Sequence, residues 1–227
     1  MLNIYPNKID IVVQSKYPQI LKEFRESFLP TVTNFPNLTL HVFDGHEYGA
    51  KPLNDLLGVL VHTSEYFGVF NDDMWFVQGW LENVVELLKD HEVVSAGYVE
   101  TKDKNVFLKA VETTKKETGF VPYLYGPNAM FRVNIFKKIG RFDDRYDWSC
   151  DDLDWAWRIH LNKMSSVTSK KITVGHMVGT SLTGNSKNWH GILKLNNQRF
   201  YDKHGYDPYR WIRSEYKTYH QYFRQFK

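Results

Sequence analysis

Short apolar runs alternate with helical patterns along the first hundred residues, and this alternation constrains the fold of the chain more than any other feature. Apolar runs rich in β-branched and aromatic residues predict strands, and apolar residues spaced three and four apart predict the helices between them. A repeated strand and helix of this kind predicts an α/β protein with a mostly parallel sheet flanked by helices. The predicted strands cover 9–13, 38–43, 66–70 and 93–98, and the predicted helices begin near Pro18, Leu53 and Gly79.

The pattern changes after residue 100. The polar and charged stretch 102–118 predicts a mobile loop. Beyond it the sequence predicts a short helix over 133–138, an amphipathic helix over 152–161 and a strand over 172–174 that leads to His176. Because no internal repeat and no Gly/Ser/Pro-rich linker interrupts this order, we expect these elements to belong to the same body as the first hundred residues.

The composition fits such a fold with an appendage. A chain of 227 residues suits one large α/β domain or a domain with a smaller addition. Aromatic residues make up 16% of the chain, which indicates a packed core together with stacking positions at the surface. The net charge of +3 is unevenly spread, because residues 186–227 hold nine Lys and Arg against three Asp and Glu. The C-terminal segment is therefore basic, and the rest of the chain is mildly acidic.

This C-terminal segment is also rich in aromatic residues. Tyr209, Ile212, Tyr216, Tyr219 and Phe223 recur at helical spacing, which predicts an amphipathic helix that docks on the body. The interleaved aromatic and basic side chains also leave open a contact with nucleic acid or with an anionic membrane surface.

Two absences in the sequence narrow the class of protein. No stretch approaches the roughly 18 apolar residues of a membrane-spanning helix, and the first residues do not resemble a secretory signal. We therefore expect a soluble cytoplasmic protein. It would be peripheral at a membrane if its C-terminal segment binds lipid. Cys150 is the single cysteine, which excludes an intrachain disulfide and Cys-rich zinc sites. Asp151 beside it disfavours a thiolate, so a cysteine nucleophile is not expected.

Acidic residues gather at three predicted strand ends or helix starts: Asp44, the run 71–73, and the cluster 151–154. Ligands of α/β sheets bind beyond the carboxyl ends of the strands, so these groups could face one cleft. Carboxylate oxygens suit Mg²⁺ or Mn²⁺, the cations that accompany phosphate substrates. Any one group alone is more typical of helix caps and turns, but together they indicate a site for a metal-bound diphosphate.

Two blocks of the sequence resemble the family 2 glycosyltransferases. In the first block an apolar strand runs into an Asp-x-Asp-like triplet and a Gly-Trp-Leu helix start, as in YFGVFNDDMWFVQGWL over 66–81. The second block follows in the family's order, with GPNAMFR at 126–132, FKKIGRFD at 136–143, DDLDWAWR at 151–158, then His176 and Ser181. The set is more specific than any one motif, and the resemblance extends over roughly residues 9–181.

The resemblance implies a GT-A fold, which is a Rossmann-like sheet flanked by helices, with an aromatic-rich helical extension at its C-terminus. The catalytic domain would cover 1–185, with a nucleotide-binding half at 1–100 and an acceptor and catalytic half at 101–185. The extension would cover 186–227. The implied activity is metal-dependent, inverting transfer of a sugar, of the hexosyltransferase type, from a nucleoside-diphosphate sugar to a hydroxyl of a glycan or glycoconjugate, with a UDP-sugar favoured.

The resemblance also implies residue roles for the donor and the metal. Asp44 would recognise the base or ribose, and Asp73 would bind Mn²⁺ or Mg²⁺, with His176 as a late metal ligand. The remaining donor contacts would come from Lys51, Asn54, Asn71 and Asp72. The sequence departs from the family pattern at Asn71, where Asp is usual, which weakens the expected contact to ribose or metal.

On the acceptor side, the resemblance makes Asp152 the general base. Asp151 takes the place of the usual Glu before it and would contact the acceptor. Crowding by Asp151 and Asp154 is expected to raise the pKa of Asp152, and Trp148 could stack on an acceptor sugar. Two other functions stay open: the same chemistry on a modified base in DNA, and a non-catalytic module that binds nucleotide sugars or carbohydrates.

Overall fold

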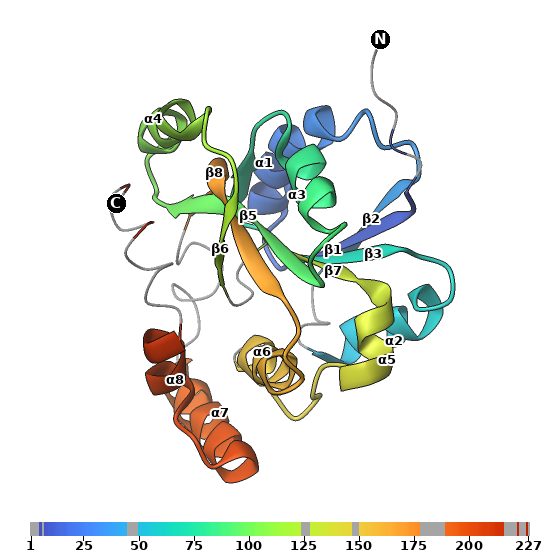
Figure 1. The fold of residues 1–227 in the computed structure, drawn as a ribbon, viewed down its shortest axis with the longest axis vertical. Helices are drawn as coiled ribbons and strands as arrows, with labels where there is room; N and C mark the ends of the chain where they lie inside the picture. Colours follow the sequence, from blue (N-terminus) through green and yellow to red (C-terminus); the bar gives the residue numbers. More distant parts are fainter. Residues whose placement is uncertain are drawn as a thin grey trace.

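A mostly parallel eight-stranded sheet forms the centre of the protein in a computed structural model that describes residues 5, 7–44, 50–123, 128–146, 150–177, 189–215, 222 and 226 (Figure 1). The strand order is β2-β1-β3-β7-β5-β8-β4, with β6 paired to β8. The strands are β1 (Ile9–Ser15), β2 (Leu38–Asp44), β3 (Tyr66–Asn71), β4 (Met74–Phe76), β5 (Val93–Glu100), β6 (Phe120–Pro122), β7 (Asn128–Arg132) and β8 (Ser166–His176).

The strand directions bring most carboxyl ends to one edge of the sheet. β1 is parallel to β2 and β3, and β5 is parallel to β8. β7 lies between β3 and β5 and is antiparallel to both, so β5 and β8 run in the same direction as β1, β2 and β3. In sheets of this type ligands bind at the carboxyl edge.

The sheet curls so that its far end returns toward β3. β3 and β4 are four places apart in the strand order, which would separate them by roughly 19 Å in a flat sheet. The two residues that join them reach across roughly 11 Å at most. Phe70 of β3 and Phe76 of β4 accordingly pack against each other, with ring centroids 5.9 Å apart and the ring planes tilted by 50°. The loop between β3 and β4 therefore lies where the curled sheet closes on itself.

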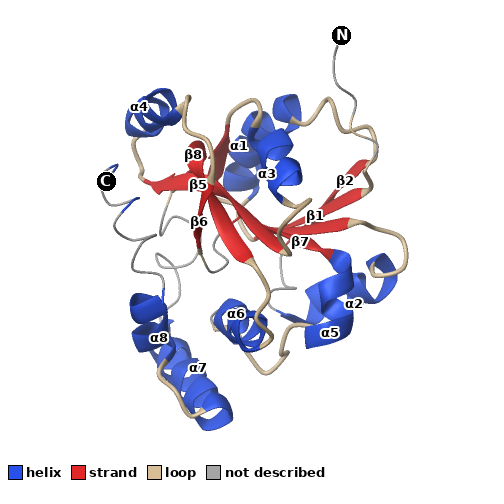
Figure 2. Ribbon diagram, in the orientation of Figure 1, coloured by secondary structure: helices blue, strands red, loops and turns tan. Residues whose placement is uncertain are grey.

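Helices cover both faces of the sheet (Figure 2). α1 and α3 lie on one face, and α2, α5 and α6 lie on the other. The described helices are α1 (Pro18–Phe28), α2 (Ala50–Leu60), α3 (Trp80–Leu87), α4 (Lys104–Thr114), α5 (Phe136–Ile139), α6 (Asp151–Leu161), α7 (Trp189–His204) and α8 (Pro208–Glu215), with 3₁₀ turns at Leu29–Thr31 and Val133–Ile135.

An aromatic cluster fills each layer of the core. On the α1 and α3 side, Phe76 packs against Phe24 and Phe28 in edge-to-face geometry, with centroids 5.3 and 5.2 Å away. On the other side, Trp155 of α6 packs on Phe131 of β7 at 4.6 Å and on Phe136 of α5 at 4.9 Å. Such pairs stabilise a core beyond the area that they bury. The high aromatic content thus goes largely into the core, as expected.

The strand and helix pattern predicted for the first hundred residues is confirmed, but the loop predicted over 102–118 is wrong. That segment forms α4. The carboxylate of Asp103 caps its first turn by accepting a hydrogen bond from the Asn105 amide at 2.8 Å. Phe107 is buried and stacks on Trp75 at 6.0 Å. The buried stripe of α4 is narrow and includes a small and a polar residue, so the polar composition of the segment hid the helix.

The second half also contains strands that the sequence pattern did not mark. β8 extends over 166–176 instead of 172–174, because its polar first half, including Thr168 and Ser169, is buried between β5 and β6. β4, β6 and β7 were not predicted. Strands as short as β4 and β6, with three residues each, carry too few residues to show a period.

The C-terminal segment forms two helices beside α6 (Figure 1). Trp211 of α8 packs edge-on against Trp157 of α6 at 4.7 Å, and the buried Phe200 of α7 lies 6.1 Å from the same ring. The prediction that Tyr209 is a docking residue is wrong, since its side chain is 38% exposed. Tyr216, Tyr219 and Phe223 lie outside the described residues.

None of the helices in the described part of the chain combines the length and the apolar character that crossing a membrane requires.

Candidate functional site

The carboxyl edge of the sheet brings together three of the predicted positions. Ser15 at the end of β1 is in register with Asp44 at the end of β2, and Gln14 is in register with Asn71 at the end of β3. At the other end of the curled sheet, His176 is the last residue of β8 and pairs with Met74, the first residue of β4. The side chain of Asp44 lies outside the described residues.

Asp73 and His176 are in contact although 102 residues separate them in the sequence. Nε2 of His176 lies 3.3 Å from Oδ1 of Asp73 and 3.1 Å from the side-chain nitrogen of Asn71. The backbone amide of Met177 donates to the Asp73 carbonyl at 2.9 Å, which fixes the two strand ends against each other. Asp73 is buried, and the His176 side chain is 12% exposed. A carboxylate and an imidazole therefore meet at a slightly open position.

Asp72 is turned away from this contact. It is buried and accepts a hydrogen bond from the Ser15 hydroxyl at 2.6 Å. Ser15 also lies 3.3 Å from the Tyr17 amide, so the hydroxyl connects the end of β1 to the β3–β4 loop. No role was expected for Ser15 from the sequence, although its position at the carboxyl end of the first strand is a signal that could have identified it.

Two further polar residues at this edge were not assigned roles from the sequence. Asn128 opens β7 opposite Phe70 and is 1% exposed, and neither polar atom of its side chain has a hydrogen-bond partner among the described residues. A buried amide without partners costs stability, so its retention at a strand's end suits a ligand contact. Lys16 follows Ser15, and burial lowers the pKa of its ammonium group.

The donor atoms at Asp73 and His176 suit a divalent cation that also binds a substrate. Among the described residues no three His, Cys, Asp or Glu side chains gather closely enough to hold an ion by themselves. Mg²⁺ and Mn²⁺ in phosphate-transfer sites are held by one or two protein side chains, and the substrate's phosphates and water complete the shell. A site of two protein ligands therefore fits a cation that arrives with a diphosphate better than a permanent structural ion.

Asp151 and Asp152 open α6 and are half-buried. Burial is the largest cause that raises the pKa of both carboxyls, to about 7 for Asp151 and about 6 for Asp152, and the charge of Asp152 raises the pKa of Asp151 further. Oδ1 of Asp152 accepts from the Leu153 amide at 2.8 Å, which opposes this rise. The predicted direction of the Asp152 shift is confirmed, but its main cause is burial and not the crowding that the sequence suggested.

Asp154 belongs to a separate structural network. It is completely buried, and its carboxylate meets Lys203 at 2.5 Å, His204 at 2.7 Å and Arg158 at 2.9 Å. These partners lie on α7 and on the next turn of α6, so Asp154 joins the two helices. Its position in the acidic cluster suggested that it faces the same cleft as Asp151 and Asp152. The structure instead places it inside this network.

The other residues predicted to contact the donor or the acceptor lie in different environments. Lys51 is exposed in the first turn of α2. Asn54 uses both ends of its amide on the Phe142 backbone, accepting at 3.0 Å and donating at 2.8 Å, so it joins α2 to the segment before α6. Trp148 lies outside the described residues.

Tyr209 supplies an exposed aromatic ring near the acidic pair. It stands in the first turn of α8, and burial of its hydroxyl, followed by the negative charges of Cys150, Asp152 and Asp207, raises the pKa of the phenol to about 12. The phenol therefore lies within electrostatic range of Asp152. Aromatic spacing in the C-terminal segment marked Tyr209, but assigned it to the core.

The two acidic groups are separate in the described part of the chain. No hydrogen bond or ion pair joins Asp152 to Asp73 or His176 there. α6 ends at Leu161, four residues before β8 begins at the amino edge of the sheet, so Asp152 stands at the end of α6 farthest from that edge. A shared substrate would have to reach from one acidic group to the other.

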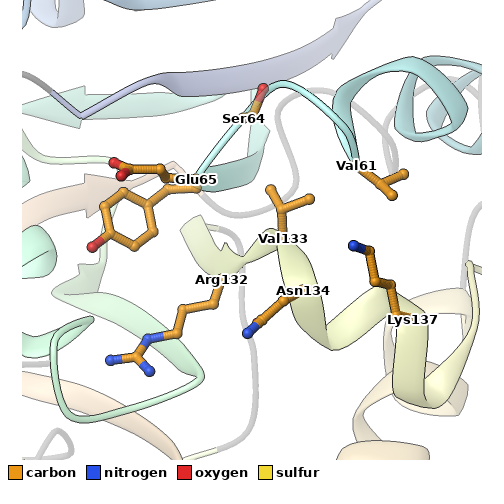
Figure 3. A pocket seen from close by; sticks show the side chains of 8 residues that line it. Val61, Ser64, Glu65, Arg132, Val133, Asn134 and Lys137 are labelled. Carbon is orange, nitrogen blue, oxygen red and sulfur yellow. The ribbon is translucent and has the colours of Figure 1, made fainter.

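A surface hollow lies on the opposite side from this edge. The hollow has a volume of about 380 Å³. Figure 3 shows the side chains that line it, which come from the segments 61–66 and 132–137. Tyr66 opens β3, whereas Asn71 closes it, so the hollow is roughly 17 Å from the Asp73 contact. The guanidinium of Arg132 donates hydrogen bonds to the carbonyl groups of Leu88 and Lys89. The hollow thus has no part in the Asp73 site.

The sequence matches no protein-family model, and a search of curated proteins finds no similar one.

Proposed function

We propose that the protein is a glycosyltransferase of the GT-A type that moves a sugar from a nucleoside-diphosphate sugar, favouring UDP, to a hydroxyl of a glycan or glycoconjugate. One observation carries the proposal. Asp73 and His176 come from motifs that resemble the family 2 glycosyltransferases, and they lie 3.3 Å apart at the carboxyl edge of a mostly parallel sheet. Nothing in the local sequence requires these two side chains to meet.

Asp73 and His176 would hold a Mn²⁺ or Mg²⁺ ion, with Asn71 beside them. Bound there with a diphosphate, such a cation stabilises the charge that develops on the leaving group. Asn71 is exposed beside His176, so its side chain would border the bound donor, whereas the buried Asp72 acts through Ser15 by holding the loop. Asn128 and Lys16 offer an amide and a cation to the diphosphate or sugar at the same edge.

Asp152 would accept the proton of the acceptor hydroxyl. In an inverting transfer this hydroxyl attacks the anomeric carbon as the bond to the diphosphate breaks, and its proton passes to a base. A base serves this step best when its pKa lies near the operating pH. Burial moves the pKa of Asp152 toward that range, to about 6.

An acceptor sugar would lie between Asp152 and the C-terminal helices. Aromatic faces stack on the apolar faces of sugars, and Tyr209 presents an exposed ring close to the acidic pair. Trp148 remains the other candidate for such a contact. This arrangement gives the C-terminal segment a role in acceptor binding as well as in packing.

Thermal stability with nucleotides tests the donor half of the proposal. Ligands that bind the folded state raise the melting temperature by mass action. We expect UDP, or another nucleoside diphosphate in a panel of UDP, GDP and dTDP, to stabilise the protein with Mn²⁺ and to lose that effect with EDTA. The absence of any metal-dependent shift across the panel would overturn the proposal.

Turnover of the stabilising nucleotide's sugars then separates an enzyme from a binding module. We expect slow hydrolysis of one donor without an acceptor and faster release of nucleoside diphosphate with glycan acceptors. Metal-dependent binding without turnover would mark the protein as a nucleotide-sugar binding module. Salt-sensitive DNA binding, with transfer only to DNA that carries modified bases, would assign the same chemistry to the other acceptor.

A further inference from the structure

The turn that starts α6 has an unusual backbone. Cys150, directly before the acidic pair, has φ 65° and ψ −6°, the left-handed conformation that favours glycine. A side chain in this conformation costs on the order of 1 kcal/mol or more, so the surroundings must hold it there. The Cys150 carbonyl accepts from the Asp154 amide at 2.8 Å, the first backbone hydrogen bond of α6. The conformation of Cys150 therefore sets where the helix starts and how Asp151 and Asp152 project from it.

Helix α7 holds this turn through a side-chain contact. The Cys150 thiol is 1% exposed and donates to Oδ1 of Asn197 at 3.2 Å. Two residues further along α7, the Arg199 guanidinium donates to the Arg145 carbonyl and, at 3.1 Å, to Oδ1 of Asn196. α7 thus holds residue 145 and residue 150, on either side of the approach to the acidic pair.

The hydrogen bond to Asn197 contributes little energy, but it fixes the orientation of the Cys150 side chain. A thiol is a weak hydrogen-bond donor, so little stability depends on this bond. Its acceptor is a side chain on another helix, however, and it meets a residue whose backbone is strained. Loss of the acceptor would remove one of the contacts that hold the strained Cys150 backbone, so the start of α6 would be held less firmly.

We propose that Asn197 is a positioning residue of the reaction, which keeps Cys150 in its left-handed conformation and so aims the carboxylates of Asp151 and Asp152 at the acceptor. This inference rests on the proposed function, in which Asp152 takes the acceptor's proton. It gives α7 a specific role in the active site beyond packing on α6.

Kinetics of Asn197→Ala test the inference in the full chain. Misplacement of a reacting group by about 1 Å costs up to about 100-fold in rate, so we expect kcat to fall by about 10- to 100-fold. The KM for the nucleotide sugar should change less than about two-fold, because the donor site at Asp73 is not touched. Gln198→Ala is the matched control and should leave kcat unchanged, since among the described residues this neighbouring amide bonds to the exposed Asp202 alone, at 2.7 Å.

A glycine at position 150 separates positioning from general damage. Glycine adopts a positive φ without strain, so Cys150→Gly should need no acceptor on α7. We expect Asn197→Ala to lower kcat strongly in the wild-type background and less than about two-fold in the Cys150→Gly background. A wild-type kcat for Asn197→Ala, or an equal loss in both backgrounds, would overturn the inference.

Two readouts do not depend on turnover and distinguish failure of this inference from failure of the proposed function. Cys150 is the single cysteine, so a thiol reagent reports on this turn alone, and we expect Asn197→Ala to label at least 10-fold faster than wild type. Carboxyl ¹³C NMR should also show changed titration of Asp151 and Asp152 in Asn197→Ala and not in Gln198→Ala. If the wild type proves inactive, the proposed function fails; unchanged labelling and titration would then also refute the restraint by Asn197, whereas changed values would support that restraint alone.

Discussion

Four aspartates that look alike in the sequence meet different environments in the folded protein. Asp72 is bonded to Ser15 and Asp73 contacts His176, although they are neighbours. Asp152 is half-buried with a raised pKa, whereas Asp154 is completely buried among cations. The environment of a carboxylate decides whether it holds a helix, binds a cation or accepts a proton. These environments depend on residues far away in the sequence.

Separate roles for Asp73 and Asp152 lead to different variant phenotypes. Asp73→Asn should remove the Mn²⁺-dependent stabilisation by nucleoside diphosphate, because the cation loses its carboxylate ligand. Asp152→Asn should keep that stabilisation and lower transfer by about 100-fold or more, as expected when a general base is lost. Thermal shift and donor turnover measure the two effects. Equal turnover by wild type and Asp152→Asn, or equal metal response by wild type and Asp73→Asn, contradicts the respective role.

The acidic pair should make stability depend on pH in an unusual direction. The pKa values of Asp151 and Asp152 are raised in the folded state to about 7 and about 6 from 3.8, so the folded protein keeps protons that the unfolded chain has released. The contribution of the pair is fully present below about pH 4 and is lost as pH rises through 6 to 7. We expect this loss to be roughly 1–2 kcal/mol after solvent screening.

Urea unfolding in EDTA between pH 5 and 8 measures this dependence. The Asp151→Asn/Asp152→Asn double variant lacks both titrating groups and serves as the reference. The free energy of unfolding of the wild type, relative to the variant, should fall with rising pH and level off above about pH 7. A difference that stays constant or rises over this range would show that the carboxyls are ionised at ordinary pKa values.

At the scale of elements, α6 serves two purposes at once. Its first turn presents Asp151 and Asp152, while its inner face packs Trp155 on the sheet and its outer face packs Trp157 on α8. Asp154 ties this helix to α7 through Lys203 and His204. The helix that carries the candidate base is therefore held from two sides.

Removal of the buried carboxylate should loosen the contact between α6 and α7. Asp154→Ala removes the carboxylate that Arg158, Lys203 and His204 share, although Lys203 keeps its second partner, Asp143, at 2.7 Å. The loss of one member of a buried ion network costs about 3–5 kcal/mol. Lys203→Met should cost less, because Arg158 still compensates the charge of Asp154 and His204 still hydrogen-bonds to it. Lys194→Met, at an exposed position of the same helix, is the control with little expected effect. Urea denaturation checks the order, and an unchanged midpoint for Asp154→Ala contradicts it.

At the scale of the whole molecule, the C-terminal helices share buried residues with the body. Phe200, Asn196 and Trp211 are buried, and Tyr222 donates a hydrogen bond to the Lys170 carbonyl of β8 at 3.0 Å. Contacts of this kind connect the extension to both α6 and the sheet. A chain packed in this way should lose its structure in one step.

Two probes of the same unfolding transition test this cooperativity. Far-UV circular dichroism follows all helices and strands, and the reactivity of the Cys150 thiol follows the contact between α6 and α7. We expect both signals to give the same urea midpoint for the wild type. Thiol exposure at clearly lower urea would show that the C-terminal helices unfold as an independent unit.

The predictability of the molecule differed between its two halves. The first hundred residues form strands and helices whose apolar period is visible locally, and β1, α1, β2, α2, β3, α3 and β5 follow the predicted ranges closely. α4 and the polar half of β8 escaped prediction because their burial comes from partners elsewhere, such as Trp75 for Phe107. In the candidate site, His176 and Asp73 could be named from their motifs. Ser15 and Asn128 were given no role although one lies just beyond the first predicted strand and the other lies in a quoted motif, and nothing local marks Asn197.

The sequence by itself determined the alternation of strands and helices, because hydrophobic period and turn residues act over a few neighbours. It also placed acidic side chains at the ends of those elements. Only the tertiary structure decided which carboxylates share a site, since the curl of the sheet brings His176 to Asp73 and the docking of α7 removes Asp154 from the surface. Such contacts depend on how distant segments pack, and no local pattern records that.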